Sequence, residues 1–437
     1  MCPVITPTGR AAYAKGIAET GRRHMDYLDI EGGYPLRGEA RIQGSKNAAL
    51  PILSGALLHS GVTVLKNCPD ITDVTAMLEL LRGCDCQVRQ ERGALVVDAS
   101  ALMPLQAEEA YAEKMRSSIM LLGSLLGRLG EVRLPYPGGC VIGARPVDIH
   151  LAALTQMGAK IKLEENGIYA VCRSPHGAEI HLPFPSVGAT ENVILLAVKA
   201  EGETILHGAA REPEICELCR FLRSMGARIR GEGSGRIVIE GGQQLYDTEF
   251  TVMPDRIVAG TYMLLLAATG GRIRLREAPV EQLDSLWPVL SELGVESKTG
   301  KDGVSLTRRE VKPCHLAIST APYPGFPTDL QSPLMAVLAA LPGESRICER
   351  VFEARYKIVE ELRKMGADIT VTGEEALVRG RSLQGAALTA RELRGGAALC
   401  IAAAAAQGKS RILQYPFIAR GYENIIRDLQ ALGVVIH

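Results

Sequence analysis

The feature that most constrains the fold of this chain is an internal repeat of about 70 residues. In one series, an apolar helical segment stops at a glycine and a strand-like segment follows, at Gly83, Gly158, Gly226, Gly294, Gly366 and Gly433. In a second series, an Ala- and Leu-rich segment precedes the glycine, at Gly61, Gly130, Gly202, Gly271, Gly343 and Gly408. Two interleaved series with one period indicate six copies of a unit that holds two helices and several strands.

The glycines have a mechanical reason, because a helix that turns directly into a strand favours a residue at positive φ. One such unit cannot bury both of its faces, so neighbouring units must pack together. Six units in 437 residues predict an α/β protein of two domains with three units each, divided near residues 241–250. Aromatic residues make up 4% of the chain, so small and aliphatic side chains must fill the core.

The composition excludes several functional classes. The formal net charge is zero, so nothing global attracts nucleic acid or an anionic membrane. Eleven scattered cysteines argue against a disulfide framework and favour a cytoplasmic location. The apolar runs 118–129 and 397–406 are too short to span a membrane, and residues 1–25 are interpreted as an extension without a signal peptide. Cys216 and Cys219 form a CxxC, but their context is typical of a helix and no second CxxC or His pair stands at zinc spacing, so no metal is predicted. Glycine-rich nucleotide motifs are absent from the sequence, and no cofactor is predicted.

Two segments carry residues with binding or catalytic chemistry. In residues 41–53, a glycine-bearing turn precedes an apolar helix that begins near Lys46 and Asn47, where backbone N–H groups and the helix dipole favour an anion. The alternative there is a solvated helix cap. In residues 136–150, Cys140 lies among prolines and glycines close to Arg145, a setting that favours a reactive thiol in a flexible loop. The alternative is an inert loop cysteine.

A third segment, residues 321–333, is a proline-rich loop that ends where a helix begins. From spacing alone, Asp329 is interpreted as the N-cap of that helix, and a general base that faces a cleft is the alternative. Each of four arginines at the edges of elements is interpreted by itself as a surface charge: Arg116, Arg355, Arg394 and Arg420.

Taken together, these segments resemble the UDP-N-acetylglucosamine 1-carboxyvinyltransferase family, which acts at the first committed step of peptidoglycan synthesis. The matching pieces occur in the family's order over residues 25–437: GSKNAALPIL, MRSSIMLLG, LPYPGGCVIGARPVDIH, SVGATENV, AREPEI, MPDRI, YPGFPTD, VFEARY, ELRGGAAL and ARGYE. The piece around Cys140 is the most specific of them.

The resemblance implies the inside-out α/β barrel of the enolpyruvyl transferases, with six repeated units in two domains. One domain would comprise residues 44–253 and the other residues 26–43 with 254–437. The implied reaction is an addition and elimination that moves the enolpyruvyl group of phosphoenolpyruvate to the 3′-hydroxyl of UDP-N-acetylglucosamine and releases phosphate.

Roles follow from the resemblance by matching position. The implied catalytic residues are Cys140 as a loop acid, Asp329, Lys46 and Glu392. Arginine binds planar oxyanions bidentately, and the residues implied to hold phosphoenolpyruvate are Lys46, Asn47, Arg145, Arg394 and Arg420. The residues implied to contact the UDP-sugar are Asn47, Arg116, Arg145, Pro146, Val147, Asp148, Ile149, Ser186, Val187, Asp329 and Val351.

Two positions depart from the family pattern. The family usually has aspartate at Glu392, which bears on proton transfer, and many members have a basic residue at Phe184, which bears on diphosphate binding. These departures keep open a catalytically weak regulatory paralogue that binds the UDP-sugar. A 3-phosphoshikimate enolpyruvyl transferase would have the same fold, and the loop around Cys140 argues against it.

We predict that an epoxide of the fosfomycin type alkylates Cys140, because this thiol resembles the family's drug target and lies in a glycine-flanked segment. Peptide mass spectrometry of the labelled chain measures the site of attachment. Cys140→Ser should abolish labelling and keep the fold, since a loop side chain contributes little to a core. Labelling of a different cysteine, with activity lost and Cys140 intact, would contradict this.

Overall fold

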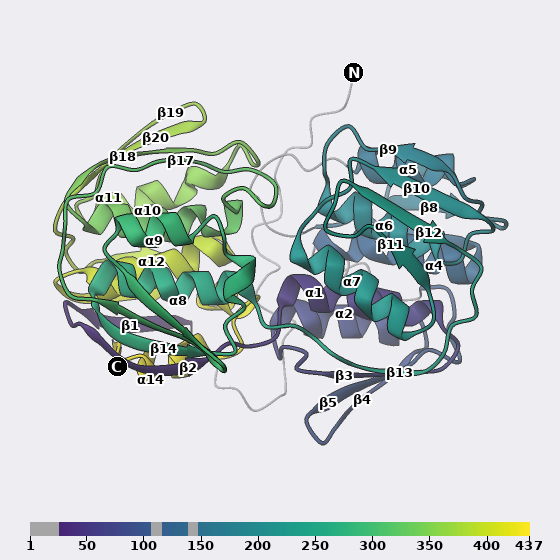
Figure 1. Ribbon diagram of the computed structural model, residues 1–437, viewed down its shortest axis with the longest axis horizontal. Helices are drawn as coiled ribbons and strands as arrows, with labels where there is room; N and C mark the ends of the chain where they lie inside the picture. Colours follow the sequence, from purple (N-terminus) through teal and green to yellow (C-terminus); the bar gives the residue numbers. More distant parts are fainter. Residues whose placement is uncertain (1–25, 106–115, 139–146) are drawn as a thin grey trace.

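The computed structural model describes residues 26–105, 116–138 and 147–437, which form two lobes side by side (Figure 1). The buried apolar side chains fall into two clusters. One cluster draws on residues 48–253 and defines the first lobe. The other draws on residues 28–42 and 257–434 and defines the second lobe. From β1 onward, the chain therefore runs from the second lobe into the first and then back to the second.

Each lobe alternates helices and strands. The first lobe contains α1 (Lys46–Gly55), η1 (Ala56–Leu58), β3 (Val62–Lys66), α2 (Thr72–Arg82), β4 (Gln87–Glu91), β5 (Ala94–Asp98), η2 (Arg116–Met120), α4 (Leu121–Leu129), β6 (Glu131–Pro135), α5 (Asp148–Gln156), β7 (Lys160–Glu164), β8 (Gly167–Val171), β9 (Glu179–His181), α6 (Val187–Ala197), β10 (Glu203–His207), α7 (Pro213–Ser224), β11 (Arg228–Arg230), β12 (Arg236–Glu240) and β13 (Thr248–Thr251). The second lobe contains β1 (Tyr27–Gly32), β2 (Leu36–Arg41), α8 (Arg256–Thr269), β14 (Gly271–Arg276), η3 (Val280–Gln282), α9 (Trp287–Glu292), β15 (Glu296–Gly300), β16 (Gly303–Arg308), β17 (Ala317–Ser319), η4 (Thr328–Leu330), α10 (Gln331–Ala340), β18 (Gly343–Cys348), η5 (Arg355–Ile358), α11 (Val359–Lys364), β19 (Asp368–Thr372), β20 (Glu375–Gly380), β21 (Ala387–Thr389), α12 (Leu393–Ala405), β22 (Gly408–Leu413), α13 (Pro416–Ala419), α14 (Ile425–Ala431) and β23 (Val435–Ile436).

The strands form six small sheets within the described residues, three in each lobe. The strand orders in the first lobe are β13-β3-β5-β4, β6-β8-β7 and β11-β12-β10-β9. Those in the second lobe are β15-β16-β14-β2, β17-β18-β20-β19 and β21-β22-β1-β23. Five of these sheets join one parallel pair to antiparallel neighbours, as in β13–β3 and β10–β9. The repeat in the sequence is thus a repeat of one small sheet with its helices.

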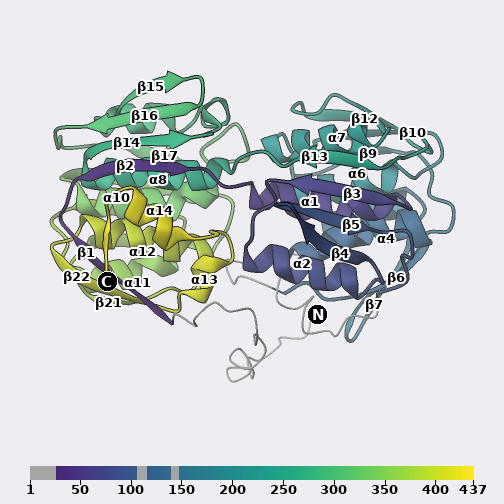
Figure 2. The same cartoon turned by 90° about the horizontal axis from the view of Figure 1, so that it is seen from below.

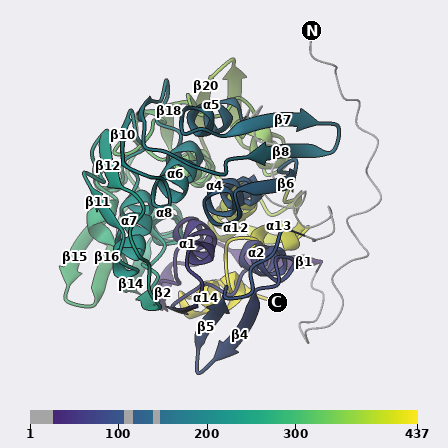
Figure 3. The ribbon, with the colours of Figure 1, turned by 90° about the vertical axis from the view of Figure 1, so that its right-hand side faces the viewer.

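Helices fill the inside of each lobe and the sheets lie outside them (Figures 1 and 2). In the second lobe α8, α10 and α12 pack against one another. In the first lobe α4 packs against both α1 and α6, and Figure 3 views these helices from the side of the molecule. A helix that is apolar all round is stable only when it is buried, and α8 is buried from Arg256 to Ala268. Even so, no helix in the described parts of the chain combines the length and apolarity needed to cross a membrane.

The chain crosses between the lobes at two adjacent points. Gly44 and Pro254 form an antiparallel bridge, and the Ser45 N–H donates to the carbonyl of Met253 at 2.8 Å. A Cβ atom on Gly44 would lie 1.8 Å from the carbonyl oxygen of Asn67, so this crossing accepts only glycine. The two connections are therefore held together, and the elements that follow them start from one place.

Ten of the twelve repeat glycines have the positive φ that the sequence predicts. The prediction is wrong for Gly83, which keeps a helical φ of −64°. The positive φ falls on Asp85, at 60°, and the backbone hydrogen bonds around Asp85 repeat those around Gly158. The prediction also fails for Gly61, where a Cβ atom would lie 2.2 Å from Oδ1 of Asp247. Gly61 is therefore required for a close approach and not for its φ.

We expect Gly366→Ala to lower the free energy of unfolding by about 1 kcal/mol, because an L side chain is strained at positive φ. Gly366 has a φ of +90°, and a Cβ atom added there would have no neighbour within 4 Å, so steric contact plays no part. Gly235→Ala is the matched control, since that position is equally open and lies outside the left-handed region. The urea concentration at the unfolding midpoint is measured for both variants. Equal midpoints would contradict the strain argument.

Candidate functional site

A cleft of about 450 Å³ lies between the lobes, and side chains from both lobes line it. This volume is in the range of small-molecule sites. The structure brings ten of the predicted site residues to the wall of the cleft: Lys46, Asn47, Ile149, Ser186, Val187, Asp329, Val351, Glu392, Arg394 and Arg420. The same wall carries several side chains that the sequence did not single out as ligands, and they are described below.

The buried helices begin at this cleft. Ser45 caps α1 by accepting from the Ala48 N–H at 3.3 Å, and Ser186 caps α6 by accepting from the Ala189 N–H at 3.3 Å. In the second lobe, Asp255 caps α8, and η4, which carries Asp329, leads directly into α10. Helix N-termini present unpaired N–H groups and a positive dipole end. The cleft is therefore suited to anionic ligands.

A lysine and an arginine from opposite lobes meet on one carboxylate. Nζ of Lys46, in α1, lies 2.8 Å from Asp73 Oδ2, and Nε of Arg420 donates to Asp73 Oδ1 at 2.8 Å. Burial of Asp73 raises its pKa, but Lys46 and Arg420 outweigh this effect and the pKa is lowered overall. The group is thus one anion between two cations, with net positive charge at the cleft. Arg145, the third predicted member, lies outside the described residues.

A second charged group surrounds Asp329. Its Oδ1 accepts from Nη2 of Arg355 at 2.5 Å and its Oδ2 from Nη2 of Arg394 at 2.9 Å. The interpretation of Asp329 as an N-cap is wrong, because α10 has no side-chain cap. Burial raises the pKa of Asp329, but Arg394 and Arg355 outweigh it and hold the pKa well below its usual range. The carboxylate is ionised and firmly paired.

The interpretation of the lone arginines as surface charges is wrong for three of them. Arg355 and Arg394 are 4% and 3% exposed, and Arg420 is partly buried against Asp73. Removing a guanidinium from water is unfavourable unless a carboxylate accepts its hydrogen bonds. Each of the three has such a partner. The side chain of the fourth, Arg116, lies outside the described residues.

Glu392 is a helix cap in this structure. It is 7% exposed, its Oε2 accepts from the Arg394 N–H at 2.8 Å, and its other oxygen accepts from the Gly395 N–H. Nη1 of Arg355 lies 3.5 Å from Oε2. The longer side chain thus folds back onto the first turn of α12 and places its charge beside the pair formed by Arg355 and Asp329.

An acidic group on the same wall was missed by the sequence analysis. Glu214 forms a bidentate pair with Arg256, at 3.0 and 3.2 Å, and so joins the two lobes. Glu212 accepts from the Tyr323 N–H at 3.2 Å. Glu191 is fully buried, and neither of its oxygens has a hydrogen-bond partner among the described residues. Its pKa is raised well above the usual value by burial, and further by Glu214 and Glu212. Glu191 lies in α6, whereas Glu212 and Glu214 lie at the start of α7, so spacing gave no signal for the group.

The remaining predicted site residues either lie away from the wall of the cleft or fall outside the described residues. Val147 packs against the core of the first lobe and Asp148 is exposed at the start of α5, and neither is on the wall of the cleft. Cys140, Arg145 and Pro146 lie outside the described residues.

Known proteins resemble this chain over most of its length. A family model described as EPSP synthase (3-phosphoshikimate 1-carboxyvinyltransferase) matches residues 30–429. Curated relatives named UDP-N-acetylglucosamine 1-carboxyvinyltransferase include one from Nitratidesulfovibrio vulgaris, 43% identical over 413 residues, and one from Desulfovibrio desulfuricans, 44% identical over 416 residues. A relative from Caldanaerobacter subterraneus with the same name and the number 2 is 44% identical over 415 residues. Each alignment covers 94% of this chain and 99% of the relative.

Solved structures share the fold at lower identity. The enolpyruvyl transferase NikO from Streptomyces tendae is 24% identical with a TM-score of 0.84, over 94% of this chain and 98% of that one. EPSP synthase from Acinetobacter baumannii is 19% identical with a TM-score of 0.71, over 94% of this chain and 99% of that one. These likenesses confirm the predicted enolpyruvyl transferase fold.

We predict that Glu191 makes stability depend on pH. Its folded-state pKa is raised above the ordinary value of 4.5, so its favourable contribution is complete below that value and is lost as the pH rises through the folded-state pKa. Glu191→Gln keeps the shape and removes the titration. The urea midpoint of this variant relative to the parent should therefore increase as the pH rises above about 5 and through the folded-state pKa of Glu191. Glu165→Gln, at an exposed position, is the control for the substitution itself. A difference in urea midpoint between Glu191→Gln and the parent that does not change with pH would contradict the raised pKa of Glu191.

Proposed function

The chain belongs to the UDP-N-acetylglucosamine 1-carboxyvinyltransferase family, and from this premise we propose how its cleft performs the enolpyruvyl transfer. The donor is phosphoenolpyruvate, the acceptor is the 3′-hydroxyl of UDP-N-acetylglucosamine, and phosphate is released. The observation that carries the proposal is the meeting of Lys46, Arg394 and Arg420 with helix N-termini in one cleft. Both substrates are anions, and this wall offers them positive charge.

Lys46 and Arg420 bind the phosphate of phosphoenolpyruvate. Asp73 holds both cations in place before the substrate arrives, which preorganises them for the charge that develops as phosphate leaves. Because they come from opposite lobes, a bound phosphate is clamped from two sides. We assign Arg145 to the same group by its position in the family motif, and Asn47, next to Lys46, to both substrates.

The UDP-sugar occupies the part of the cleft that residues of the first lobe line. Ile149, Ser186 and Val187 line this part, and Val351 faces it from the second lobe. Phe184 also lines it and is 43% exposed, so an aromatic face stands where many relatives have a basic residue. The family motif adds four further contacts to the UDP-sugar: Arg116, Pro146, Val147 and Asp148.

Proton transfer involves Asp329 and Cys140. While Arg355 and Arg394 both hold Asp329, its low pKa makes it a poor base. We propose that Arg394 turns to the carboxylate of phosphoenolpyruvate, so that the pKa of Asp329 rises toward its ordinary value. Asp329 then takes the proton of the 3′-hydroxyl as its oxygen attacks C2, and Cys140 gives a proton to C3. Loss of phosphate and of a C3 proton from the tetrahedral intermediate restores the enol ether.

The two hydrophobic clusters support a division into two domains, residues 44–253 and residues 26–43 with 254–437, with residues 1–25 as an extension. We place the activity in the cytoplasm, at the committed step of peptidoglycan synthesis. In support, all nine described cysteines are free thiols, as expected in a reducing compartment.

Phosphate release tests the proposed function. The full chain with phosphoenolpyruvate should release phosphate when UDP-N-acetylglucosamine is added and not when shikimate 3-phosphate is added. Release with shikimate 3-phosphate alone would assign the other transferase. Binding of UDP-N-acetylglucosamine without release would identify a regulatory paralogue, and either result would overturn the proposal.

Glu392 provides a sharper prediction for the mechanism. Glu392→Asp keeps a capping carboxylate and should keep turnover within a few-fold of the parent. Glu392→Gln loses the charge beside Arg355 and should lower turnover by at least about tenfold, the effect of one interaction of about 1.4 kcal/mol. Thermal unfolding of both variants separates this loss from the weakened cap. Parent-like turnover of Glu392→Gln would leave the carboxylate with a structural role only.

A further inference from the structure

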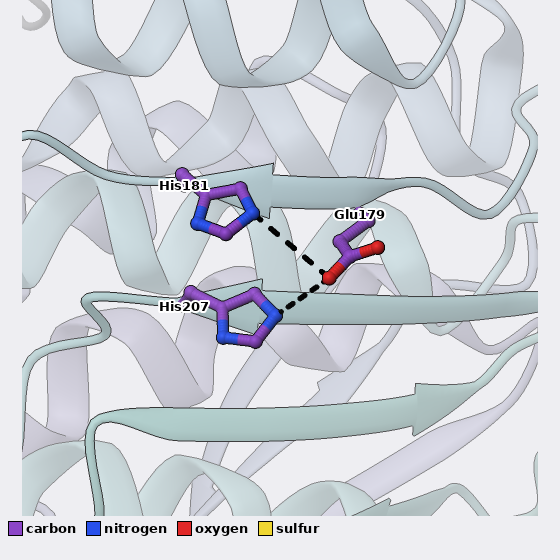
Figure 4. Close-up of side chains that lie close together, drawn as sticks. All are labelled: Glu179, His181 and His207. Atoms are coloured by element: carbon purple, nitrogen blue, oxygen red, sulfur yellow. Dashed lines mark hydrogen bonds and ion pairs between the residues drawn. The ribbon is translucent and has the colours of Figure 1, made fainter.

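Three metal-ligand side chains lie together on a sheet outside the cleft (Figure 4). Glu179 and His181 belong to β9, and His207 is the last residue of β10. The two strands are parallel neighbours, and His181 stands directly opposite His207 in the register. Side chains two residues apart on a strand share a face, so Glu179 lies on the same face as both histidines.

The three side chains converge on one point. The imidazole rings are stacked, with centroids 4.4 Å apart and planes 5° from parallel. Oε1 of Glu179 lies 3.0 Å from Nε2 of His207 and 3.9 Å from Nε2 of His181, as the dashed lines in Figure 4 mark. Among the described residues, these two histidines are the ion-pair partners of Glu179, and no lysine or arginine competes for its carboxylate.

We propose that Glu179, His181 and His207 form a binding site for a divalent transition-metal ion of the zinc class. Two imidazole nitrogens and one carboxylate oxygen suit Zn²⁺, whereas Mg²⁺ and Ca²⁺ prefer oxygen ligands alone. Zinc binds such donors at about 2.0–2.2 Å, which places two donors of a tetrahedral site roughly 3.3 Å apart. The separations of 3.0 and 3.9 Å lie on either side of this value, and the two stacked rings must tilt toward each other so that both nitrogen lone pairs point at one ion.

The position of the cluster allows an ion to enter from solvent. The side chain of His181 is 69% exposed and that of His207 is 30% exposed. Water therefore completes the coordination. A site with three protein ligands and an open position holds its metal less tightly than a closed four-ligand site, so we expect an exchangeable ion.

The site also lies next to segments that reach the cleft. The chain after β9 leads to Phe184 and Ser186, and the chain after β10 leads to Glu212, all on the cleft wall. The Leu182 N–H donates to the carbonyl of His207 at 3.0 Å, which already joins the two segments. A metal ion on His181 and His207 would add a second tie between them and stabilise the folded chain by mass action.

Isothermal titration with ZnCl2 tests the proposal on the full chain, without an affinity tag and after dialysis against a chelator. We expect saturable binding that weakens by about tenfold or more in His181→Gln and in His207→Gln, the effect of losing one ligand interaction of about 1.4 kcal/mol. Glu179→Gln should weaken it as well. His315→Gln is the matched control, because His315 is exposed on the other lobe and should leave binding unchanged.

Locating the bound zinc ion directly completes the test. Zinc-edge anomalous diffraction from crystals of the parent should show a peak between the three side chains, and circular dichroism should show that all variants are folded. Two results would overturn the site. The first is an absence of binding heat up to about 1 mM zinc, because a dissociation constant above that concentration corresponds to a binding free energy of only a few kcal/mol. The second is unchanged zinc affinity in the double variant His181→Gln/His207→Gln, which would place the ion on a thiol.

Discussion

The carboxylate of Asp255 accepts hydrogen bonds from the first turns of two helices that belong to different lobes. Its Oδ1 accepts from the Ile257 and Val258 N–H groups of α8 at 2.8 and 3.1 Å, and its Oδ2 accepts from the Lys46 N–H of α1 at 3.1 Å. Asp255 is 2% exposed and follows the point where the chain crosses back to the second lobe. A buried carboxylate is stable when several N–H groups satisfy it. This one carboxylate therefore fixes the crossing and makes the starts of both helices face one cleft.

The charges on the cleft wall follow from that arrangement. Helix N-termini from both lobes favour anions, and the cations beside them cannot be left unpaired when they are buried. Carboxylates of the protein therefore pair with these cations: Asp73 lies between Lys46 and Arg420, and Asp329 lies between two arginines. Glu191 is the exception, because neither of its oxygens has a hydrogen-bond partner among the described residues and burial raises its pKa well above the usual value. The cleft is preorganised for anions, because carboxylates of the protein already hold its cations in place.

What the sequence could predict depended on how local each signal was. The repeat could be detected because helix, glycine and strand follow one another within a few residues. The prediction of positive φ failed at two members, Gly61 and Gly83, and at Gly83 the positive φ falls two residues later, on Asp85. The burial of the arginines could not be recognised, because their partners are distant in the sequence. Arg394 pairs with Asp329 at a separation of 65 residues, and Arg420 pairs with Asp73 at a separation of 347 residues. The family motif supplied their roles in binding, whereas their burial and pairing required the fold. The histidine cluster gave no signal for the same reason, since adjacent parallel strands bring it together.

In the proposed mechanism, the pairing of Asp329 with Arg394 links binding of the donor to activation of the base. The pair is buried and its hydrogen bond is 2.9 Å long, so breaking it without a replacement would leave a guanidinium unpaired, at a cost of about 3–5 kcal/mol. A substrate carboxylate has the same charge and shape as the one it replaces, so the exchange of partners requires much less. Asp329 loses one of its two arginines only when phosphoenolpyruvate is present, and its pKa rises at that moment. In this scheme the order of events is a property of the charge pairs, and Arg355, which keeps its contact with Asp329, holds the base in position throughout.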